Sequence, residues 1–272
     1  MHDYPGGRDD EDGPAPFRRA PLEPTMTLSP ARTVALVTGG SRGIGAAISR
    51  RLAADGHAVA INHAGRRDDA EALAAELNAA GAQAIALQAD VVDSQAVNQL
   101  FDAIEARFGG IDVVVNSAGV LQLAPLADTD DALFERVIGI NLKGAFNVLR
   151  ESARRVRDGG RLITLSTSVV GIKLENYSVY AASKAAVETM GAILSKELRG
   201  RNITVNAVAP GPTATDLFLD GKSPELIERL AKMNPLERLG TPEDIAGAVA
   251  FLAGTDGGWV NGQVLRANGG MV

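Results

Sequence analysis

Residues 34–45 read VALVTGGSRGIG, and this stretch decides the fold. Its first part, 34–38, is a short valine-rich run, as expected of a strand buried on both faces of a sheet. Glycines follow closely, just where a helix is expected to begin. Such glycines allow a tight turn and let a phosphate approach the backbone N–H groups at the positive end of a helix. A glycine-rich turn can also serve chain geometry alone, but its place after the first strand favours phosphate binding.

Short β-rich runs alternate with longer alanine-rich helical runs from residue 31 onward. Parallel strands need long crossovers of this kind, and successive units wind right-handed. We therefore expect one doubly wound α/β domain of the Rossmann type over 31–272, a seven-stranded parallel sheet with helices on both faces. The predicted strands are 33–39, 57–62, 82–90, 111–119, 161–166, 203–210 and 263–267, and the predicted helices are 43–55, 68–80, 94–108, 130–156, 178–199 and 242–252, with one or two more between 211 and 241.

The first 30 residues differ from the rest, because six of the twelve prolines fall there beside the acidic run RDDEDG. This composition predicts a disordered N-terminal extension outside the fold. It has neither the apolar run of a signal peptide nor the acid-poor character of a transit peptide, and no later window could span a bilayer. We expect a cytoplasmic protein.

Composition also argues against several classes of site. There is no cysteine and there are only three histidines, so thiolate and histidine-built metal sites are not expected. The net charge of −6 argues against a dedicated surface for nucleic acid or an anionic membrane.

The glycine turn also fits G-x-S-x-G, the nucleophile elbow of hydrolases, with Ser41 as the nucleophile. That order of residues requires an acid and then a histidine downstream of the serine. No histidine follows His63, so the triad cannot be completed and this alternative is rejected.

The end of the second predicted strand bears on the choice of cofactor. An enzyme that prefers NAD places an acid there to bind the ribose 2′-hydroxyl, whereas this chain has Asn62 and His63. Arg42 in the glycine turn and the arginines at 66 and 67 make the neighbourhood basic, which suits a 2′-phosphate. The alternative is that these arginines are merely solvated and that Asp68 caps the next helix. The missing acid favours NADP(H) over NAD(H).

Two tyrosines precede a lysine in YSVYAASK, residues 177–184. On a helix, Tyr180 and Lys184 are four residues apart and share a face, whereas Tyr177 lies two turns from the lysine. An ammonium group nearby, joined by a positively charged nicotinamide, would lower the pKa of the phenol. We expect Tyr180 to be the acid or base, although a tyrosine and a lysine at this spacing are more often a surface pair.

With these motifs in order along residues 31–272, the sequence resembles the short-chain dehydrogenase/reductase family. TGGSRGIG is similar to that family's Thr-Gly-x3-Gly-x-Gly cofactor loop, and NSAG at 116–119 to its Asn-Asn-Ala-Gly. Tyr180 and Lys184 fit its Tyr-x3-Lys, and PGPTAT at 210–215 resembles the loop that lies against the nicotinamide. The expected cofactor-binding residues are Gly39, Ser41, Arg42, Gly43, Ile44, Gly45, Asn62, His63, Asp90, Val91, Asn116, Ala118, Gly119, Tyr180, Lys184, Pro210, Gly211 and Thr213.

The resemblance also implies two further catalytic residues. Asn141 corresponds to the residue that holds a water on the proton path, and Ser168 to the hydroxyl that binds the substrate carbonyl. Ser168 precedes Tyr180 by twelve residues where thirteen is frequent in the family, so Ser166 and Thr167 are the alternatives. Enoyl reductase relatives use Tyr-x6-Lys, the spacing of Tyr177, but their cofactor loop is longer before its last glycines than the loop here.

The function expected from these features is NADP-dependent interconversion of a ketone and a secondary alcohol, acting on a small-molecule substrate. A sugar or polyol dehydrogenase working oxidatively is an alternative, and a non-catalytic dinucleotide-binding protein is a remoter one. A 3-oxoacyl group on acyl carrier protein is another possible substrate, for which Arg201 matches a basic position but Asp158 and Gly159 replace a frequent basic pair.

Two expectations concern larger parts of the molecule. The family resemblance implies a homotetramer that uses the C-terminal strand and the helix bearing Tyr180. The segment 213–238 is too long for a simple connection, and its apolar residues, among them Leu217, Phe218 and Leu230, predict a mobile lid over the substrate. The alternative is that these side chains pack as core.

Overall fold

A computed structural model describes residues 33–272, and the predicted disordered extension, residues 1–30, lies outside them. Seven parallel strands form one sheet in the order β3-β2-β1-β4-β5-β6-β7. This confirms the predicted doubly wound sheet. The strands are β1 (Val34–Thr38), β2 (Ala58–His63), β3 (Gln83–Gln88), β4 (Val113–Asn116), β5 (Arg161–Leu165), β6 (Thr204–Pro210) and β7 (Val264–Ala267).

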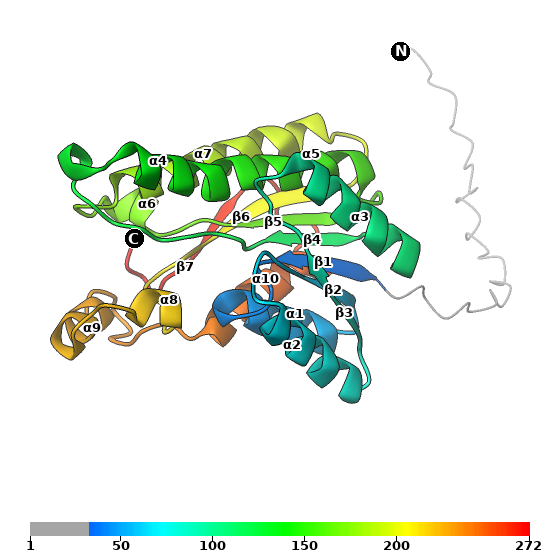
Figure 1. Ribbon diagram of the computed structural model, residues 1–272, viewed down its shortest axis with the longest axis horizontal. Coiled ribbons are helices and arrows are strands. Elements are labelled where there is room, and N and C mark those ends of the chain that lie inside the picture. The colour runs from blue at the N-terminus through cyan, green and yellow to red at the C-terminus, as the bar shows by residue number, and fades with distance from the viewer. Residues whose placement is uncertain (1–32) are drawn as a thin grey trace, which may run out of the picture. The chain divides into compact units, whose positions relative to one another are not determined.

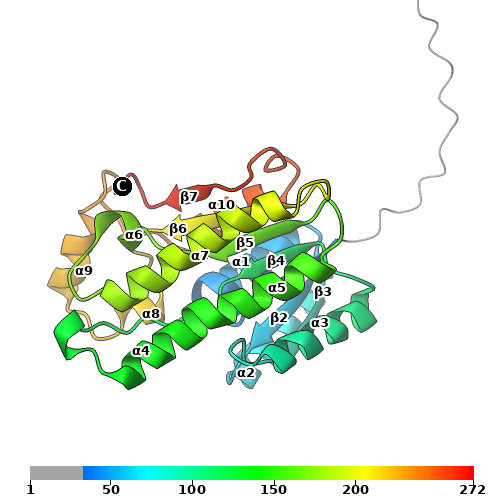
Figure 2. The ribbon, with the colours of Figure 1, turned by 90° about the horizontal axis from the view of Figure 1, so that it is seen from above.

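Helices cover both faces of the sheet, as Figures 1 and 2 show. One layer holds α1, α2 and α10, and the other holds α3, α4, α5 and α7. The helices are α1 (Gly43–Ala54), α2 (Arg67–Ala79), α3 (Ser94–Phe108), α4 (Asp131–Ile138), α5 (Ala145–Arg155), α6 (Val169–Ile172), α7 (Ser178–Glu197), α8 (Asp216–Leu219), α9 (Pro224–Ala231) and α10 (Pro242–Ala253), with a 3₁₀ turn η1 (Leu126–Asp128) and a π-helical turn η2 (Gly139–Gly144).

The central strands are buried along their whole length, except for the half-buried Arg161 that begins β5, whereas the edge strands β3 and β7 are partly exposed. The continuous apolar runs arise because each central strand packs against helices on both faces. The sheet thereby separates two apolar clusters, one under α1, α2 and α10 and the other under α3, α5 and α7.

The predicted helix 130–156 is interrupted in the structure by the π-helical turn η2. Gly144 ends this turn, and a Cβ added there would lie 2.6 Å from a methyl carbon of Val91. The chain therefore passes close to the loop after β3, a contact that the helical periodicity of the sequence does not reveal. The short α6 was likewise not predicted, while α8 and α9 fill the segment for which one or two helices were expected.

The loop between α10 and β7 carries the most exposed large apolar side chain of the described residues. Trp259 in this loop is 99 % exposed, and Phe251 on the neighbouring α10 is 43 % exposed.

Candidate active site

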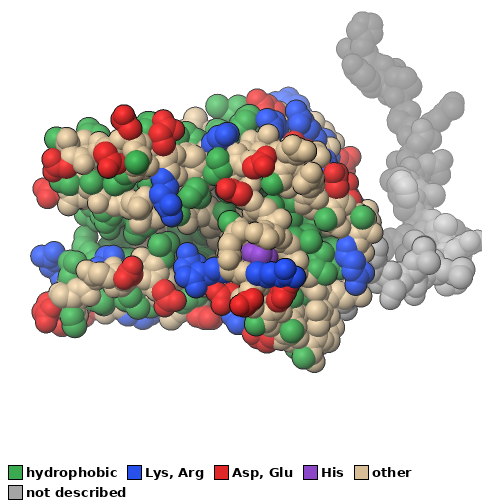
Figure 3. Space-filling view, in the orientation of Figure 1, with side chains coloured by type: hydrophobic (Ala, Val, Ile, Leu, Met, Phe, Trp, Pro, Cys, Tyr) green, Lys and Arg blue, Asp and Glu red, His purple; other side chains and the backbone are tan. Residues whose placement is uncertain are grey.

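A cavity of about 480 Å³ opens at the carboxyl ends of the strands. Its walls come from the segments that follow β1, β2, β3, β4, β5 and β6, together with α7 and α8. Figure 3 shows this face hollowed between the two helix layers, with hydrophobic side chains along the hollow. β1 lies between β2 and β4, so the chain reverses its direction of winding there, and ligands of doubly wound folds bind at such a point.

The glycine turn after β1 forms one end of the cavity. Gly39 has φ +60°, and a Cβ on Gly45 would lie 2.2 Å from the carbonyl oxygen of Gly39. Arg42 precedes α1 without capping it through its side chain, so the first backbone N–H groups of the helix lack a side-chain acceptor. A glycine-lined helix N-terminus fits the diphosphate of a dinucleotide.

Thr38 ties the glycine turn to the turn after β4. Its Oγ1 donates to Asn116 Oδ1 at 3.0 Å and accepts from the backbone N–H groups of Ser117 and Ala118, each at 3.1 Å. Asn116, predicted to touch the cofactor, lies behind the cavity wall with its side chain directed to Thr38, whereas Ala118 and Gly119 line the cavity.

The end of β2 contributes a neutral, buried pair. Asn62 lines the cavity as predicted, and its amide also joins neighbouring segments: its Oδ1 accepts from Gly39 N at 3.4 Å and its Nδ2 donates to Ala89 O at 3.0 Å. His63 lines the cavity, and burial lowers the pKa of its imidazole. The Nδ1 of His63 has no hydrogen-bond partner among the described residues. A buried polar atom without a partner beside a basic cavity mouth fits an added ligand group.

The three arginines near this end differ in their partners. Arg66 and Arg67 pair with Asp69 and Glu71, while Arg42 forms no ion pair within residues 33–272. Arg42 and Arg66 line the cavity, and Arg67 does not. Asp68 lies in the first turn of α2 and is not its cap.

Tyr180 and Lys184 lie on one face of α7 at the cavity, as their spacing predicts. Lys184 is 5 % exposed, and its Nζ donates to Leu165 O at 2.8 Å. Burial lowers the pKa of Lys184 to about 8 and raises that of Tyr180 to about 12. The sequence-based expectation was a phenol pKa lowered by the ammonium group together with a positively charged nicotinamide. In the protein alone, burial acts in the opposite direction, and its effect on the pKa of Tyr180 is the larger one.

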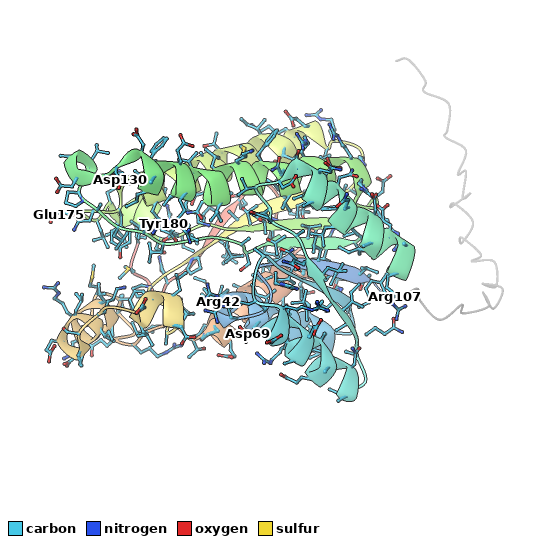
Figure 4. The ribbon with its side chains drawn as sticks, in the orientation of Figure 1. Arg42, Asp69, Arg107, Asp130, Glu175 and Tyr180 are labelled. Atoms are coloured by element: carbon cyan, nitrogen blue, oxygen red, sulfur yellow. The ribbon has the colours of Figure 1, made fainter. Side chains whose placement is uncertain are left out.

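Tyr177 lines the cavity next to Tyr180, with ring centroids 6.2 Å apart at 68°. Burial raises the pKa of Tyr177. Tyr180 is the tyrosine that shares a helix face with Lys184. Figure 4 shows Tyr180 and Arg42 on opposite sides of the gap between the two helix layers.

Asn141 lies in the π-helical turn and does not line the cavity. Its Oδ1 accepts from Val120 N at 2.8 Å, and its Nδ2 donates to Val120 O and to Ser183 Oγ. The side chain therefore holds the segment after Gly119 against α7. A Cβ on Gly119 would lie 3.2 Å from Asn141 Oδ1 and 3.4 Å from Lys184 Nζ, so these three residues meet at one point of the site.

Ser166, Thr167 and Ser168 follow β5 and all line the cavity. Ser166 Oγ donates to Glu188, and Ser168 Oγ donates to Ala209 O and accepts from Asn268. Thr167 Oγ1 accepts from the backbone N–H of Val169 at 3.3 Å. The direction of these hydroxyl groups could not be read from their spacing in the sequence.

Most of the remaining predicted cofactor residues also line the cavity. They are Gly39, Ser41, Gly43, Ile44, Gly45, Asp90, Val91, Pro210, Gly211 and Thr213. The sequence analysis missed an apolar wall at the Tyr180 end, formed by Val169, Ile172, Leu174 and Met271, and an exposed Arg136. Of the predicted lid, Leu217, Phe218 and Leu230 reach the cavity.

Comparison with known proteins identifies the family. A family model described as enoyl-(acyl carrier protein) reductase matches residues 39–272. A short-chain type dehydrogenase/reductase of Picea abies is 48 % identical over 249 residues, covering 88 % of this chain and 92 % of that protein. The chain belongs to the short-chain dehydrogenase/reductase family. The predicted resemblance is thereby confirmed.

Two further relatives of this short-chain dehydrogenase/reductase have informative names. An Arabidopsis thaliana protein named NADPH-dependent aldehyde reductase-like protein, chloroplastic, is 45 % identical over 264 residues, 92 % of this chain and 97 % of that protein. The crystal structure of a short-chain dehydrogenase from Burkholderia cenocepacia in complex with NADP superposes with a TM-score of 0.83 at 37 % identity, covering 89 % and 98 % of the two chains.

The family and the cavity together define an oxidoreductase that uses a nicotinamide dinucleotide on carbonyl or alcohol groups. Within residues 33–272, no cluster of acidic or histidine side chains could hold a metal ion. No helix in the same range is long and apolar enough to cross a bilayer.

Proposed function

We propose that this protein is an NADPH-dependent reductase of aldehydes and ketones. The observation that carries the proposal is the placement of Tyr180 and buried Lys184 on one wall of a cavity whose other end is a glycine-lined helix N-terminus. The names of the Arabidopsis relative and of the NADP-bound Burkholderia structure agree with this chemistry.

The cofactor-binding roles follow from position. The turn at Gly39–Gly45 would hold the diphosphate, and Arg42 and His63 would face a 2′-phosphate on the adenosine ribose. Neutral Asn62 stands where an acid would select NAD(H), which is why we propose a preference for NADP(H). Bound NADPH supplies a hydride to the carbonyl carbon of the substrate.

Side chains of the protein supply the proton that the substrate oxygen gains in the reduction. Tyr180, with a phenol pKa of about 12, is protonated at neutral pH and donates its proton to the carbonyl oxygen. General acid catalysis of this kind contributes roughly 10²–10⁴-fold. Lys184 lies where its ammonium group would hold the nicotinamide ribose, and Asn141 fixes the segment around Gly119 beside it. Alcohol oxidation runs through the same groups in reverse, with the phenolate as base.

The substrate end of the cavity favours apolar carbonyl compounds. Its wall is formed by Ile172, Leu174, Leu217, Phe218 and Met271, so it offers few partners for the hydroxyl groups of a sugar or polyol. Arg201, the basic residue considered for acyl carrier protein, pairs with Asp158 at 2.8 Å and donates to the Ala153 and Val156 carbonyls. These bonds tie Arg201 to its own chain, so we propose a free small-molecule substrate.

The predicted cytoplasmic location stays a prediction, and the name of the Arabidopsis relative gives the chloroplast for that protein.

The test is NADPH consumption at 340 nm with apolar aldehydes, aromatic ketones, a sugar and an enoyl thioester. We expect turnover of the apolar carbonyls. Tyr180→Phe should lose at least about 100-fold in kcat with NADPH binding retained, and the matched Tyr177→Phe should stay within a few-fold. Turnover of the enoyl thioester and of no other substrate would refute the proposal. An inactive Tyr177→Phe variant beside an active Tyr180→Phe variant would also refute it.

A further inference from the structure

The turn formed by residues 268–272 contributes one side chain to the apolar end of the cavity. Met271 lines the cavity together with residues of α6 and of the helices α8 and α9, but it belongs to none of these helices. It is half-buried, whereas the neighbouring Val272 is exposed. A methionine side chain is flexible, and its sulfur makes favourable contacts with aromatic rings. Met271 is therefore placed to contact an apolar group of a bound substrate.

The buried amide of Asn268 holds this turn in place. Its Oδ1 accepts from the backbone N–H groups of Gly270 and Met271, at 3.0 and 3.1 Å. Its Nδ2 donates to Val272 O at 3.2 Å and to Ser168 Oγ at 2.9 Å. Asn268 is only 8 % exposed, so water competes little for these bonds. The position of Met271 in the cavity wall thus depends on one side-chain amide.

Close contacts on two sides also confine the turn. Gly269 has φ +68°, and a Cβ there would lie 2.5 Å from Asn234 Oδ1, in the segment that follows α9. On the other side, a Cβ on Gly171 of α6 would lie 2.8 Å from a methyl carbon of Val272. Figures 1 and 2 both show the chain reaching α6 at this end. Because the two glycines allow such close approach, the turn has little freedom to move away from the wall.

We propose that Met271 is a specificity-determining residue, which limits the size of the apolar group on the substrate carbonyl, and that Asn268 is its positioning residue. This inference rests on the proposed function. Met271 and Tyr180 line the same end of the cavity, so a carbonyl held at the phenol directs one of its two substituents toward the apolar wall. Aromatic ketones suit this wall, because a ring offers apolar surface and a contact for the sulfur while needing no hydrogen-bond partner.

Steady-state kinetics with NADPH compare acetophenone with 2-acetonaphthone, which has the larger ring system. Met271→Ala should raise kcat/KM for the larger ketone relative to the smaller by about tenfold, since one methylene in an apolar pocket already changes selectivity by about that factor. Met271→Phe should lower the ratio, and Met271→Leu, of similar volume, should leave it near the wild-type value. Met190→Ala is the matched control, because Met190 lies on α7 and does not line the cavity. An unchanged ratio in both Met271→Ala and Met271→Phe would overturn the inference.

Two variants of Asn268 test its positioning role. Asn268→Asp keeps an oxygen that accepts from the two backbone N–H groups, so the ratio of the two ketones should stay near the wild-type value. Asn268→Ala removes this acceptor and should shift the ratio in the same direction as Met271→Ala does. A ratio that shifts equally in both Asn268 variants, or in neither, would overturn the positioning role.

A labelling experiment tests the contact without turnover. With ¹³C in the methionine methyl groups, the Met271 signal is identified by its loss in Met271→Leu. Met190 and Met233 do not line the cavity, so their signals serve as internal references. In the presence of NADP⁺, which cannot reduce the ketone, added 2-acetonaphthone should shift the Met271 signal and leave the references in place.

This experiment separates the inference from the proposed function. A protein that reduces no carbonyl of the panel but shows the Met271 shift would refute the proposed function and support the wall contact. A protein that reduces 2-acetonaphthone while its Met271 signal does not move would overturn the inference and leave the proposed function standing.

Discussion

Lys184 has an ammonium group buried beside an uncharged carbonyl, and this placement has a cost in stability. Its pKa is about 8 in the folded protein against an ordinary value of 10.5. Below pH 8 the unfolded chain binds its proton more tightly than the folded one does, which destabilises the fold by about 3 kcal/mol. The penalty fades as pH rises from 8 toward 10.5. Burial of this cation therefore lowers the stability of the fold at neutral pH.

Lys184→Met should therefore abolish reductase activity and change the pH dependence of stability. We compare the free energies of unfolding of the wild type and the variant at pH 7 and at pH 10. From the lower to the higher pH, the free energy of unfolding of the wild type should rise by about 2–3 kcal/mol relative to that of the variant. Urea denaturation of both proteins at the two pH values measures this. A difference between the two proteins that does not change with pH would show that Lys184 is not desolvated.

Only some of the residue-level features of the site could be predicted from the sequence. The spacing of Tyr180 and Lys184 placed them on one helix face, because helical periodicity is a local property. The hydrogen bonds of Ser168 were out of reach, because Asn268, which donates to its hydroxyl, lies 100 residues later in the chain.

At the scale of elements, the ends of β1 and β2 set the cofactor preference. We expect a kcat/KM for NADPH well above that for NADH, and Arg42→Ala should narrow the ratio by about tenfold, since it removes one charge-assisted contact worth about 1.4 kcal/mol. Arg67→Ala is the matched control, because Arg67 is paired with Glu71 and does not line the cavity. Equal use of NADH by the wild type would contradict the expectation.

The helices α8 and α9 occupy the segment that was predicted to be a lid. No residue of α8 or α9 is buried, although Leu217, Phe218 and Leu230 face the cavity. We expect amide hydrogen exchange of residues 213–233 to slow when NADPH and a carbonyl substrate are added, with α10 as the internal reference. Full protection of the segment in the free protein would mean that it is core.

The strands and most helices were predicted within a few residues, because buried runs and alanine-rich amphipathic segments are distinct in this chain. The π-helical turn at Gly139–Gly144 was not. It depends on how closely the chain passes Val91, a contact between elements that no local pattern encodes.

At the scale of the whole molecule, a 28.3-kDa chain leaves apolar side chains exposed on several elements. Phe146 on α5, Ile193 on α7 and Phe251 on α10 are each more than 40 % exposed. We expect these faces to be covered in a homotetramer. Light scattering at micromolar concentration should give the mass of four chains, and deleting residues 1–28 should change neither the mass nor the activity. A monomer under these conditions would contradict the expected assembly.

The fluorescence of Trp259 can report subunit association, because it is the single tryptophan of the chain and 99 % exposed in the isolated subunit. Its emission is a one-site signal that needs no label. A subunit that stays alone should fluoresce as a fully hydrated indole does, at long wavelength and open to quenching by iodide. If a neighbouring subunit covers the loop, dilution through the dissociation range should move the emission from blue to red, and the midpoint gives the affinity between subunits.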